Sequence, residues 1–399
     1  MSSLDDVLKH RLAALREQNL FRELRRVDSA PGPRLQMNGR SLLNFASNDY
    51  LGLASHPALK AAAIAAVSEF GAGSGASRLI SGSLAPFHQL EEALAAFKGT
   101  AAALTFATGS AAALGTLTAL AGKDDILILD KLVHACIVDA ARLSGAKLRI
   151  FAHNDLDDLE AKLKWADSAA TLENGRRKSE ILVVTESIFS MDGDAAPLRA
   201  MVALKERYGA RLMVDEAHAT GIVGRNGRGL ADHLGVSDRI EIQMGTLGKA
   251  LGASGGYICG SRPLIDLLVN RARSFIFSTA PVPAAAAAAS AGIQLAQSSE
   301  GETLREQLRQ RVAELVKSVI RDPSLTIAGA IVPVILGDET KTLSAAANLR
   351  EQGIFAPAIR YPTVARSAAR LRLTLTAAHT ANDVAMLARA LEAIINPTS

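Results

Sequence analysis

Short apolar runs alternate along most of the chain with longer stretches in which apolar residues recur every three or four positions. The short runs predict buried strands, and the periodic stretches predict amphipathic helices that turn one face to a core. We expect strands at residues 42–45, 101–108, 126–129, 147–151, 181–185, 212–214 and 240–244, and a further strand, antiparallel and at an edge, at 256–259. Helices are expected at residues 57–70, 86–97, 111–120, 133–143, 156–163 and 197–208.

Strands that alternate with helices in this way predict an α/β fold, in which a mostly parallel sheet is covered by helices on both faces. The pattern divides the chain into three parts. Residues 1–52 form an N-terminal arm with an amphipathic helix over 4–25, residues 53–289 form a large domain, and residues 290–399 form a smaller α+β domain. Polar residues 167–180 are expected to make a surface excursion.

Polar and small residues follow several of the predicted strands. Ligands of open parallel sheets bind outside the carboxyl ends of the strands, so these residues are candidates for one shared site. The candidates at the strand ends are Gly109, His134, Ser187, Asp215, His218 and Lys249.

Residues 215–218, Asp-Glu-Ala-His, carry the densest chemistry in the chain. The same four letters occur in nucleotide-driven helicases, but those proteins also need a phosphate loop of the form GxxxxGK[ST]. Here Lys249 follows Gly248 and is itself followed by Ala250, and the required first glycine is Gln243. A metal site would need a third ligand, and HxxxH and HExxH spacings do not occur, so we expect no metal.

Two features have both an ordinary and a functional interpretation. Lys249 lies in the glycine-rich stretch 246–256 and is either a solvated loop lysine or a partly desolvated amine that acts as a Schiff-base nucleophile. Gly109-Ser110 joins a strand to a helix and is either a tight turn capped by Ser110 or a phosphate site at a helix N-terminus. The glycines at 71–75 follow a helix rather than a strand, which argues for a loop and against a dinucleotide fingerprint.

Composition narrows the class of protein. The 399 residues are 49% hydrophobic and 21% charged, as in ordinary globular proteins. A net charge of +4 without basic clustering gives no nucleic-acid footprint. The two cysteines, Cys136 and Cys259, cannot build a disulfide framework, and no run of eighteen apolar residues occurs, so we expect a cytoplasmic protein without a membrane partner.

One cofactor uses all the candidate parts. Pyridoxal phosphate needs a lysine for its aldehyde, an acid at its ring nitrogen and a cup for its phosphate. Lys249, Asp215 and the Gly109-Ser110 turn supply these three, and the flat side chain of His134 can stack on the ring.

The motifs at residues 186–194, 215–218 and 245–249 resemble those of the α-oxoamine synthases, which are fold-type I pyridoxal-phosphate enzymes. The resemblance extends over nearly the whole chain. It implies a large domain with a mostly parallel seven-stranded sheet, a smaller α+β C-terminal domain, an N-terminal helical arm and a homodimer. Segments 43–53, 151–155 and 370–379 most resemble members that condense L-alanine with a pimeloyl thioester of coenzyme A or acyl carrier protein.

The resemblance also implies roles for individual residues. Catalysis is assigned to Lys249, His134, Asp215 and His218, with Lys249 both holding the cofactor and removing the α-proton of the amino acid. Cofactor binding is assigned to these four residues and to Gly109, Ser110, Ser187, Thr246 and, toward the partner subunit's phosphate, Thr279. Substrate binding is assigned to Arg22, Asn48, His134, Arg360 and Thr363, with Arg360 on the amino-acid carboxylate.

The chain departs from the family pattern at several positions: Ser110, Ala113, Cys136, Tyr361 and Ala365. Tyr361 and Ala365 replace prolines and could reshape the acyl pocket, so the chemistry follows more firmly than the acyl specificity. The alternatives are an α-oxoamine synthase that uses acetyl, succinyl or long-chain acyl donors and, in another class, a non-catalytic or nucleotide-dependent binding protein.

Overall fold

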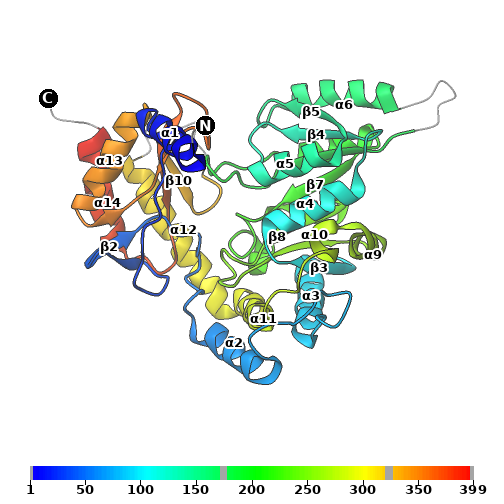
Figure 1. Ribbon diagram of the computed structural model, residues 1–399, viewed down its shortest axis with the longest axis horizontal. Helices are drawn as coiled ribbons and strands as arrows, with labels where there is room; N and C mark the ends of the chain where they lie inside the picture. Colours follow the sequence, from blue (N-terminus) through cyan, green and yellow to red (C-terminus); the bar gives the residue numbers. More distant parts are fainter. Residues whose placement is uncertain (1–2, 171–177, 320–326, 396–399) are drawn as a thin grey trace.

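The computed structural model describes residues 3–170, 178–319 and 327–395. Figure 1 shows two bodies side by side, one built on the strands β3 to β9 and the other on elements from both ends of the chain. Helices α2 (Pro57–Phe70), α3 (Ala85–Lys98) and α11 (Pro283–Gln297) lie at the base of the larger body. In the described ranges, no helix is both long and apolar enough to cross a membrane.

The larger body contains a seven-stranded sheet with the strand order β3-β9-β8-β7-β6-β4-β5. All neighbouring pairs are parallel except the two that involve β9. This arrangement confirms the predicted fold class. The strands are β3 (Ala102–Phe106), β4 (Ile126–Asp130), β5 (Lys147–Phe151), β6 (Ile181–Glu186), β7 (Arg211–Asp215), β8 (Ile242–Thr246) and β9 (Gly256–Gly260).

Strand β9 is antiparallel, as the sequence predicts, but its predicted place at an edge is wrong. It pairs with β8 on one side and with β3 on the other, and β3 is the edge strand. All five residues of β9 are buried, which fits a strand with neighbours on both sides and helices on both faces. The sequence shows apolar content but not the strand order, because that order depends on how the distant segment 102–106 returns to the sheet.

Helices cover both faces of this sheet, as expected. One face packs with α4 (Gly109–Leu120), α5 (Ala135–Ser144), α9 (Arg262–Arg271) and α10 (Arg273–Ile276). The opposite face packs with α6 (Leu156–Ala170), α7 (Leu198–Arg207) and the short α8 (Leu230–His233), and two 3-10 turns occupy Arg225–Gly227 and Ser237–Arg239. The predicted excursion 167–180 falls partly in α6, and its residues 171–177 lie outside the described ranges.

The second body combines the N-terminal strands with the C-terminal part of the chain. The antiparallel pair β1 (Arg34–Met37) and β2 (Arg40–Asn44) adds to β11 (Ile354–Phe355), and a second sheet has the order β10-β13-β12. Its strands and helices are β10 (Ile331–Gly337), β12 (Ala358–Ile359), β13 (Ala369–Thr374), α12 (Ser299–Val319), α13 (Glu339–Glu351) and α14 (Ala381–Ile395). Residues 34–44 therefore pack with the C-terminal part, while the division at residues 52 and 289 stays a prediction.

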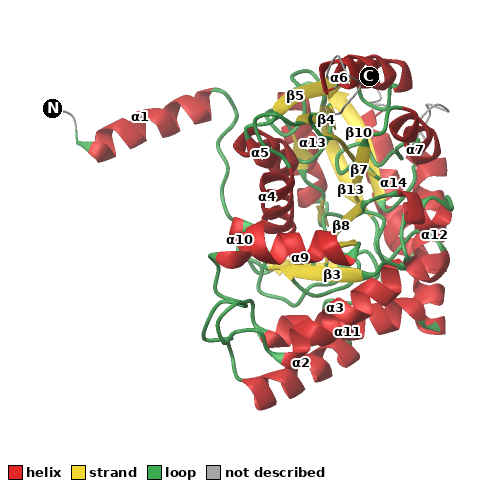
Figure 2. Cartoon of the chain, turned by 90° about the vertical axis from the view of Figure 1, so that its right-hand side faces the viewer, coloured by secondary structure: helices red, strands yellow, loops and turns green. Residues whose placement is uncertain are grey.

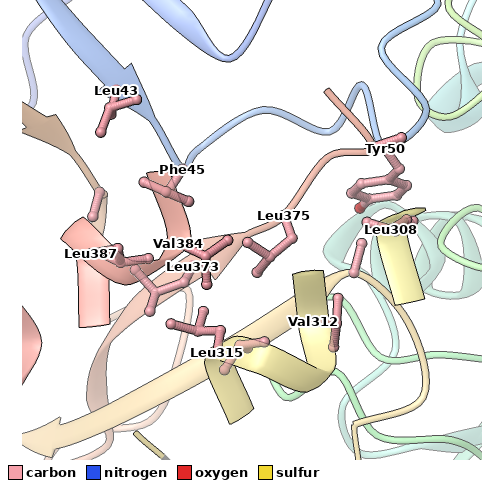
Figure 3. Packing of buried hydrophobic residues seen from close by; sticks show 14 of the residues in the cluster. Leu43, Phe45, Tyr50, Leu308, Val312, Leu315, Leu373, Leu375, Val384 and Leu387 are labelled. Atoms are coloured by element: carbon pink, nitrogen blue, oxygen red, sulfur yellow. The ribbon is translucent and has the colours of Figure 1, made fainter. Parts of the chain in front are cut away.

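The core of this second body joins residues that are far apart in the sequence. Figure 3 shows Leu43 and Phe45 above Leu373, Leu375 and the side chains of α12 and α14. Tyr50 lies at one end of the same cluster and is fully buried. The loop that follows β2 is thus fixed by apolar packing before it reaches the larger body.

Helix α1 (Leu4–Glu17) is shorter than the predicted helix over residues 4–25. It is capped by Ser3 at its start and by Gln18 at its end, and the next residue, Asn19, takes a left-handed backbone conformation with φ of 57°. Its leucines are the exposed apolar residues Leu4, Leu8, Leu12 and Leu15. Figure 2 shows α1 standing away from the rest of the chain, so the apolar face of this helix packs against no described element.

A buried ion pair ties α3 to the end of β7. The Lys98 ammonium, at the C-terminus of α3, donates to the Glu216 carboxylate and to the carbonyl oxygen of Arg228. The other carboxylate oxygen of Glu216 accepts from the backbone N–H of Ala231 at 2.9 Å. Both charged side chains are almost completely excluded from water, so each depends on its partner.

Replacing Lys98 with Met should lower the free energy of unfolding by about 3–5 kcal/mol, because the Glu216 charge would remain buried without its partner. Urea denaturation measures this change. Lys60→Met, on the exposed surface of α2, is the matched control and should change the free energy of unfolding by less than about 0.5 kcal/mol. Equal effects of the two substitutions would contradict this account of the ion pair.

Candidate active site

The carboxyl ends of five strands meet at one edge of the seven-stranded sheet. Strands β3, β4, β6, β7 and β8 all run in the same direction, since β3 and β8 are both antiparallel to β9. The structure therefore brings together the predicted strand-end residues Gly109, His134, Ser187, Asp215, His218 and Lys249. The chemistry of this edge depends on how their charges are buried.

Lys249 follows β8, and its Nζ atom lies 2.7 Å from Nε2 of His218. Burial lowers the pKa of Lys249, while the carboxylates of Asp215 and Glu186 oppose that change. Burial also lowers the pKa of His218, and the Lys249 charge adds to the effect. This environment favours the functional interpretation of Lys249, because a desolvated amine near neutral imidazole loses its proton more easily.

Two carboxyl groups lie beside this lysine. Asp215 is the last residue of β7 and pairs in register with Glu186, the last residue of β6. Burial raises the pKa of Asp215, which accepts from the backbone N–H of Ala217 at 2.9 Å and faces the Lys249 charge. Burial and the nearby Asp215 charge raise the pKa of Glu186 well above its usual range. Asp215 is thus the better candidate for the ionised acid, and Glu186 is a neighbour that sequence reasoning did not single out.

His134 is the N-cap of α5 and is partly exposed at the site. Its Nδ1 atom accepts from the backbone N–H of Cys136 at 3.2 Å and lies 3.0 Å from the Cys136 sulfur. These contacts fix the ring orientation and leave its face open. Burial lowers the pKa of His134 and raises the pKa of the Cys136 thiol to about 11, so both groups are neutral near pH 7.

The start of α4 provides a site for an anion. Thr108 caps the helix by accepting from the N–H of Ala111 at 3.0 Å, whereas the sequence suggested Ser110 as the cap. The N–H groups of Gly109 and Ser110 have no partner within the helix because they belong to its first turn. Strand β9 passes so close that a Cβ atom on Gly256 would lie 2.6 Å from the nitrogen of Gly109.

The loop that carries Lys249 also depends on a glycine. Gly252 has a left-handed φ of 68°, and a Cβ atom there would lie 2.6 Å from the carbonyl carbon of Leu53. This close approach places the loop that follows β2, with Asn48 and Tyr50, beside Lys249. Thr246 closes the start of the same loop, because its hydroxyl donates to the carbonyl of Gly255 at 3.0 Å.

This geometry has counterparts in known proteins. The family model for class I and II aminotransferases matches residues 40–391. The chain is 46% identical over 376 residues to the 8-amino-7-oxononanoate synthase of Geobacter sulfurreducens, with 94% of each chain covered. It is 48% identical over 389 residues to that of Anaeromyxobacter sp. strain K, covering 96% of this chain and 94% of the relative.

The chain belongs to the class I and II aminotransferase family and, within it, to the 8-amino-7-oxononanoate synthases. Solved structures agree. A serine palmitoyltransferase from S. paucimobilis, described with bound PLP-myriocin aldimine, has a TM-score of 0.89 at 29% identity, covering 98% of this chain and 96% of that one. The 8-amino-7-oxononanoate synthase from Francisella tularensis has a TM-score of 0.72 at 27% identity, with 88% and 96% covered.

The remaining predicted residues make contacts outside this group of strand ends. Arg360 donates to the backbone carbonyls of Asn19, at 2.5 Å, and Phe21, at 2.9 Å, so its guanidinium holds the N-terminal arm. Burial and the nearby Arg22 charge lower the pKa of Arg360. Thr363 donates its N–H to the carbonyl of Arg360 at 3.0 Å. Thr279 is exposed and forms a bridge with Ser77.

Arg372, which sequence reasoning did not single out, is the buried cation of this site. Its Nε atom donates to the carbonyl of Ser190 at 2.6 Å, and its two terminal nitrogens lie 3.3 Å from Oδ1 of Asn48. Burial is the main cause of the lowered pKa values of Lys249 and His218, and the Arg372 charge lowers both further. Arg370 and Arg372 are two residues apart on β13 and share one face of the strand. Only the contacts separate them, because Arg370 binds the Met191 carbonyl and the Asp192 carboxylate instead.

His153 joins the end of β4 with the segments that follow β5 and β6. Its ring nitrogens lie 3.0 Å from the Asp130 carboxylate and 2.9 Å from that of Asp194, and its ring meets Phe189 edge to face. Burial alone lowers the pKa of His153, but the two carboxylates outweigh burial and raise it to about 10. These three residues, His153, Asp130 and Asp194, are called the His153 clamp. The clamp connects the loop before His134 with the turn that follows Ser187.

His153→Asn should destabilise the chain most at low pH within the range where Asp130 and Asp194 are ionised. Because the folded-state pKa of about 10 exceeds the ordinary value of 6.5, the stabilisation is fully present below pH 6.5 and is lost as the pH rises through about 10. Urea denaturation of both proteins at several pH values measures it. The exposed His10→Asn should show no such trend; a pH-independent loss in His153→Asn would contradict the ion-pair explanation.

Proposed function

We propose that this chain condenses L-alanine with a pimeloyl thioester of coenzyme A or an acyl carrier protein, releasing carbon dioxide, the free carrier and 8-amino-7-oxononanoate, the reaction for which its relatives are named. The observation that carries the proposal is the desolvated Lys249 amine beside Asp215 at the carboxyl edge of the sheet. The family membership supports it.

The residues of the site fit pyridoxal phosphate. When bound, this cofactor supplies an aldehyde for a lysine and a ring that withdraws electrons from the carbon next to the substrate amine. The hydroxyl of Ser187 is fully buried and has no hydrogen-bond partner in the described structure, as expected for a group that faces a ligand. The first turn of α4 would provide N–H donors for the phosphate. Thr246 and, toward a partner subunit, Thr279 stay the predicted further phosphate contacts, although the Thr246 hydroxyl donates to Gly255 in this structure.

Each proposed catalytic residue has one physical task. Lys249 holds the cofactor covalently and, as a neutral amine of lowered pKa, removes the α-proton of alanine. Asp215 holds a proton on the ring nitrogen of the cofactor, and His134 stacks on the ring face. His218 and Ser187 bind the side of the ring that carries its hydroxyl. Asn48 lies next to the reacting centre.

The substrate carboxylate of alanine is best matched by Arg372 among the arginines described above. The Arg372 charge is buried close enough to act on Lys249 and His218, whereas the Arg360 guanidinium holds the N-terminal arm. We therefore propose Arg372 for the carboxylate, in place of the predicted Arg360, and keep Arg22 and Thr363 as the predicted acyl contacts.

We also propose that two copies assemble. The exposed leucine face of α1 and the exposed Thr279 are the features that a second copy would cover. A reducing, cytoplasmic location fits the two unpaired cysteines, Cys136 and Cys259.

The purified chain should be yellow and should convert L-alanine and a pimeloyl thioester to 8-amino-7-oxononanoate, detected by mass spectrometry. Parallel assays with the coenzyme A and acyl carrier protein thioesters identify the carrier. Glycine or serine with acetyl, succinyl or palmitoyl donors should give little product. A colourless protein without the ketone product would reject the proposal, and a preference for one of the other pairs would move it to another reaction of the α-oxoamine synthase type.

Lys249→Ala should lower turnover by at least about 10²–10⁴-fold, because the variant lacks both the attachment point and the base. Borohydride reduction followed by peptide mass spectrometry should locate the cofactor on Lys249 in the wild type. The exposed Lys123→Ala is the matched control and should keep wild-type turnover. Normal turnover in Lys249→Ala would reject the role.

Arg372→Lys should raise KM for L-alanine by about 10- to 100-fold, because an ammonium cannot replace the two parallel donors of a guanidinium. Arg360→Lys should leave KM for L-alanine within about twofold. Steady-state kinetics with alanine varied at a saturating thioester measures both. A large rise in KM for Arg360→Lys and none for Arg372→Lys would instead assign the alanine carboxylate to Arg360.

A further inference from the structure

A chain of hydrogen bonds leads from Lys249 into the second body. Nε2 of His218 lies 2.7 Å from the Lys249 amine, and Nδ1 of the same ring lies 2.6 Å from the hydroxyl of Tyr50. The Tyr50 hydroxyl lies 3.2 Å from Oδ1 of Asn48, which also faces both terminal nitrogens of Arg372 at 3.3 Å. Tyr50 is fully buried, and His218 is 5% exposed.

Packing holds Tyr50 in this position. Its ring lies at the end of the core in Figure 3, and its carbonyl accepts from the N–H of Ala377 at 2.8 Å. Residues 53 and 54 then press against Gly252 in the lysine loop. The tyrosine is thus anchored in one body and directs its hydroxyl into the site of the other.

The protons on Tyr50 and His218 allow two arrangements of this hydrogen-bond chain. Burial raises the pKa of Tyr50 to about 12 and lowers that of His218, so the phenol keeps its proton and the imidazole carries only one. In the first arrangement, the Tyr50 O–H donates to Nδ1 and the Nε2–H group donates to Lys249. In the second, Lys249 donates to Nε2, the Nδ1–H group donates to Tyr50, and the Tyr50 O–H must turn to Asn48.

The contacts favour the first arrangement. The Asn48 oxygen has two lone pairs and already faces two N–H donors of Arg372. The Tyr50 hydroxyl is also closer to His218, at 2.6 Å, than to Asn48, at 3.2 Å. Only a neutral amine can accept from Nε2–H, because an ammonium group has no lone pair.

We propose that Tyr50 is a positioning residue that fixes His218 as the Nε2–H tautomer and thereby holds the Lys249 amine in its neutral form. The inference rests on the proposed function in one respect: there, the neutral amine is the base that removes the α-proton of alanine. Other groups also act on Lys249. The charged and titratable groups that face the amine or its neighbours are Asp215, Glu186, Arg372, Cys136, His134 and His218.

Nitrogen NMR of the full-length wild-type chain, cofactor-free and labelled at histidine, tests the tautomer directly. The eight histidine signals are assigned by comparison with His218→Gln, which lacks one of them. We expect a protonated Nε2 and an unprotonated Nδ1 for His218 near pH 7. A protonated Nδ1 would overturn the proposal, and this result needs no variant of Tyr50.

Tyr50→Phe tests the effect on the lysine. Without the phenol donor, His218 can move its proton to Nδ1 and offer Nε2 as an acceptor to an ammonium. The pH midpoint for acylation of Lys249 in the cofactor-free chain, followed by peptide mass spectrometry, should rise by about one unit.

Tyr257→Phe is the matched control. Tyr257 is also fully buried, and its hydroxyl bonds to Thr220 at 2.8 Å rather than to His218. It should leave the His218 tautomer and the Lys249 midpoint unchanged. An unchanged midpoint in a folded Tyr50→Phe, checked by circular dichroism, would overturn the proposal. The NMR tautomer and the acylation midpoint are measured without substrate, so they can support the role of Tyr50 even if the synthase assay fails. If the synthase assay succeeds and these two measurements fail, only the role of Tyr50 is rejected.

Discussion

The burial of a lysine amine next to two carboxyl groups is the constraint on which the rest of this structure depends. Removing Lys249, Asp215 and Glu186 from water disfavours all three charges. The attraction between the lysine and each carboxylate opposes this effect, whereas the Asp215 charge adds to it at Glu186. The parallel strands make the arrangement possible, since β6 and β7 end in register with Glu186 beside Asp215. A site of this kind favours neutral, reactive forms of its groups.

Contacts outside the site keep these groups in place. The Lys98 and Glu216 pair fixes the turn that follows Asp215, and the His153 clamp connects the loops that precede His134 and follow Ser187. Neither contact touches the lysine. Their common effect is to reduce the freedom of strand-end loops, which otherwise are the least constrained parts of an α/β sheet.

The second body contributes more than a cover for the site. Its strand β13 supplies Arg372, and the loop that follows β2 supplies Asn48 and Tyr50. Arg372 donates to the carbonyl of Ser190 in the larger body, and the loop after β2 passes close to Gly252 in the lysine loop. The residues that surround Lys249 therefore come from both bodies, whereas the lysine and Asp215 belong to the larger one alone.

The sequence by itself determined the fold class and the strand-end residues, because apolar periodicity and the positions of strand ends are local properties. It also identified Lys249, Asp215, His218 and His134 as one set. Only the tertiary structure placed β9 between β3 and β8, ended the first helix at residue 17, and selected Arg372 over Arg360 as the buried cation. Each of these depends on contacts between segments that are distant in the sequence, and a pattern of neighbouring residues carries no record of such contacts.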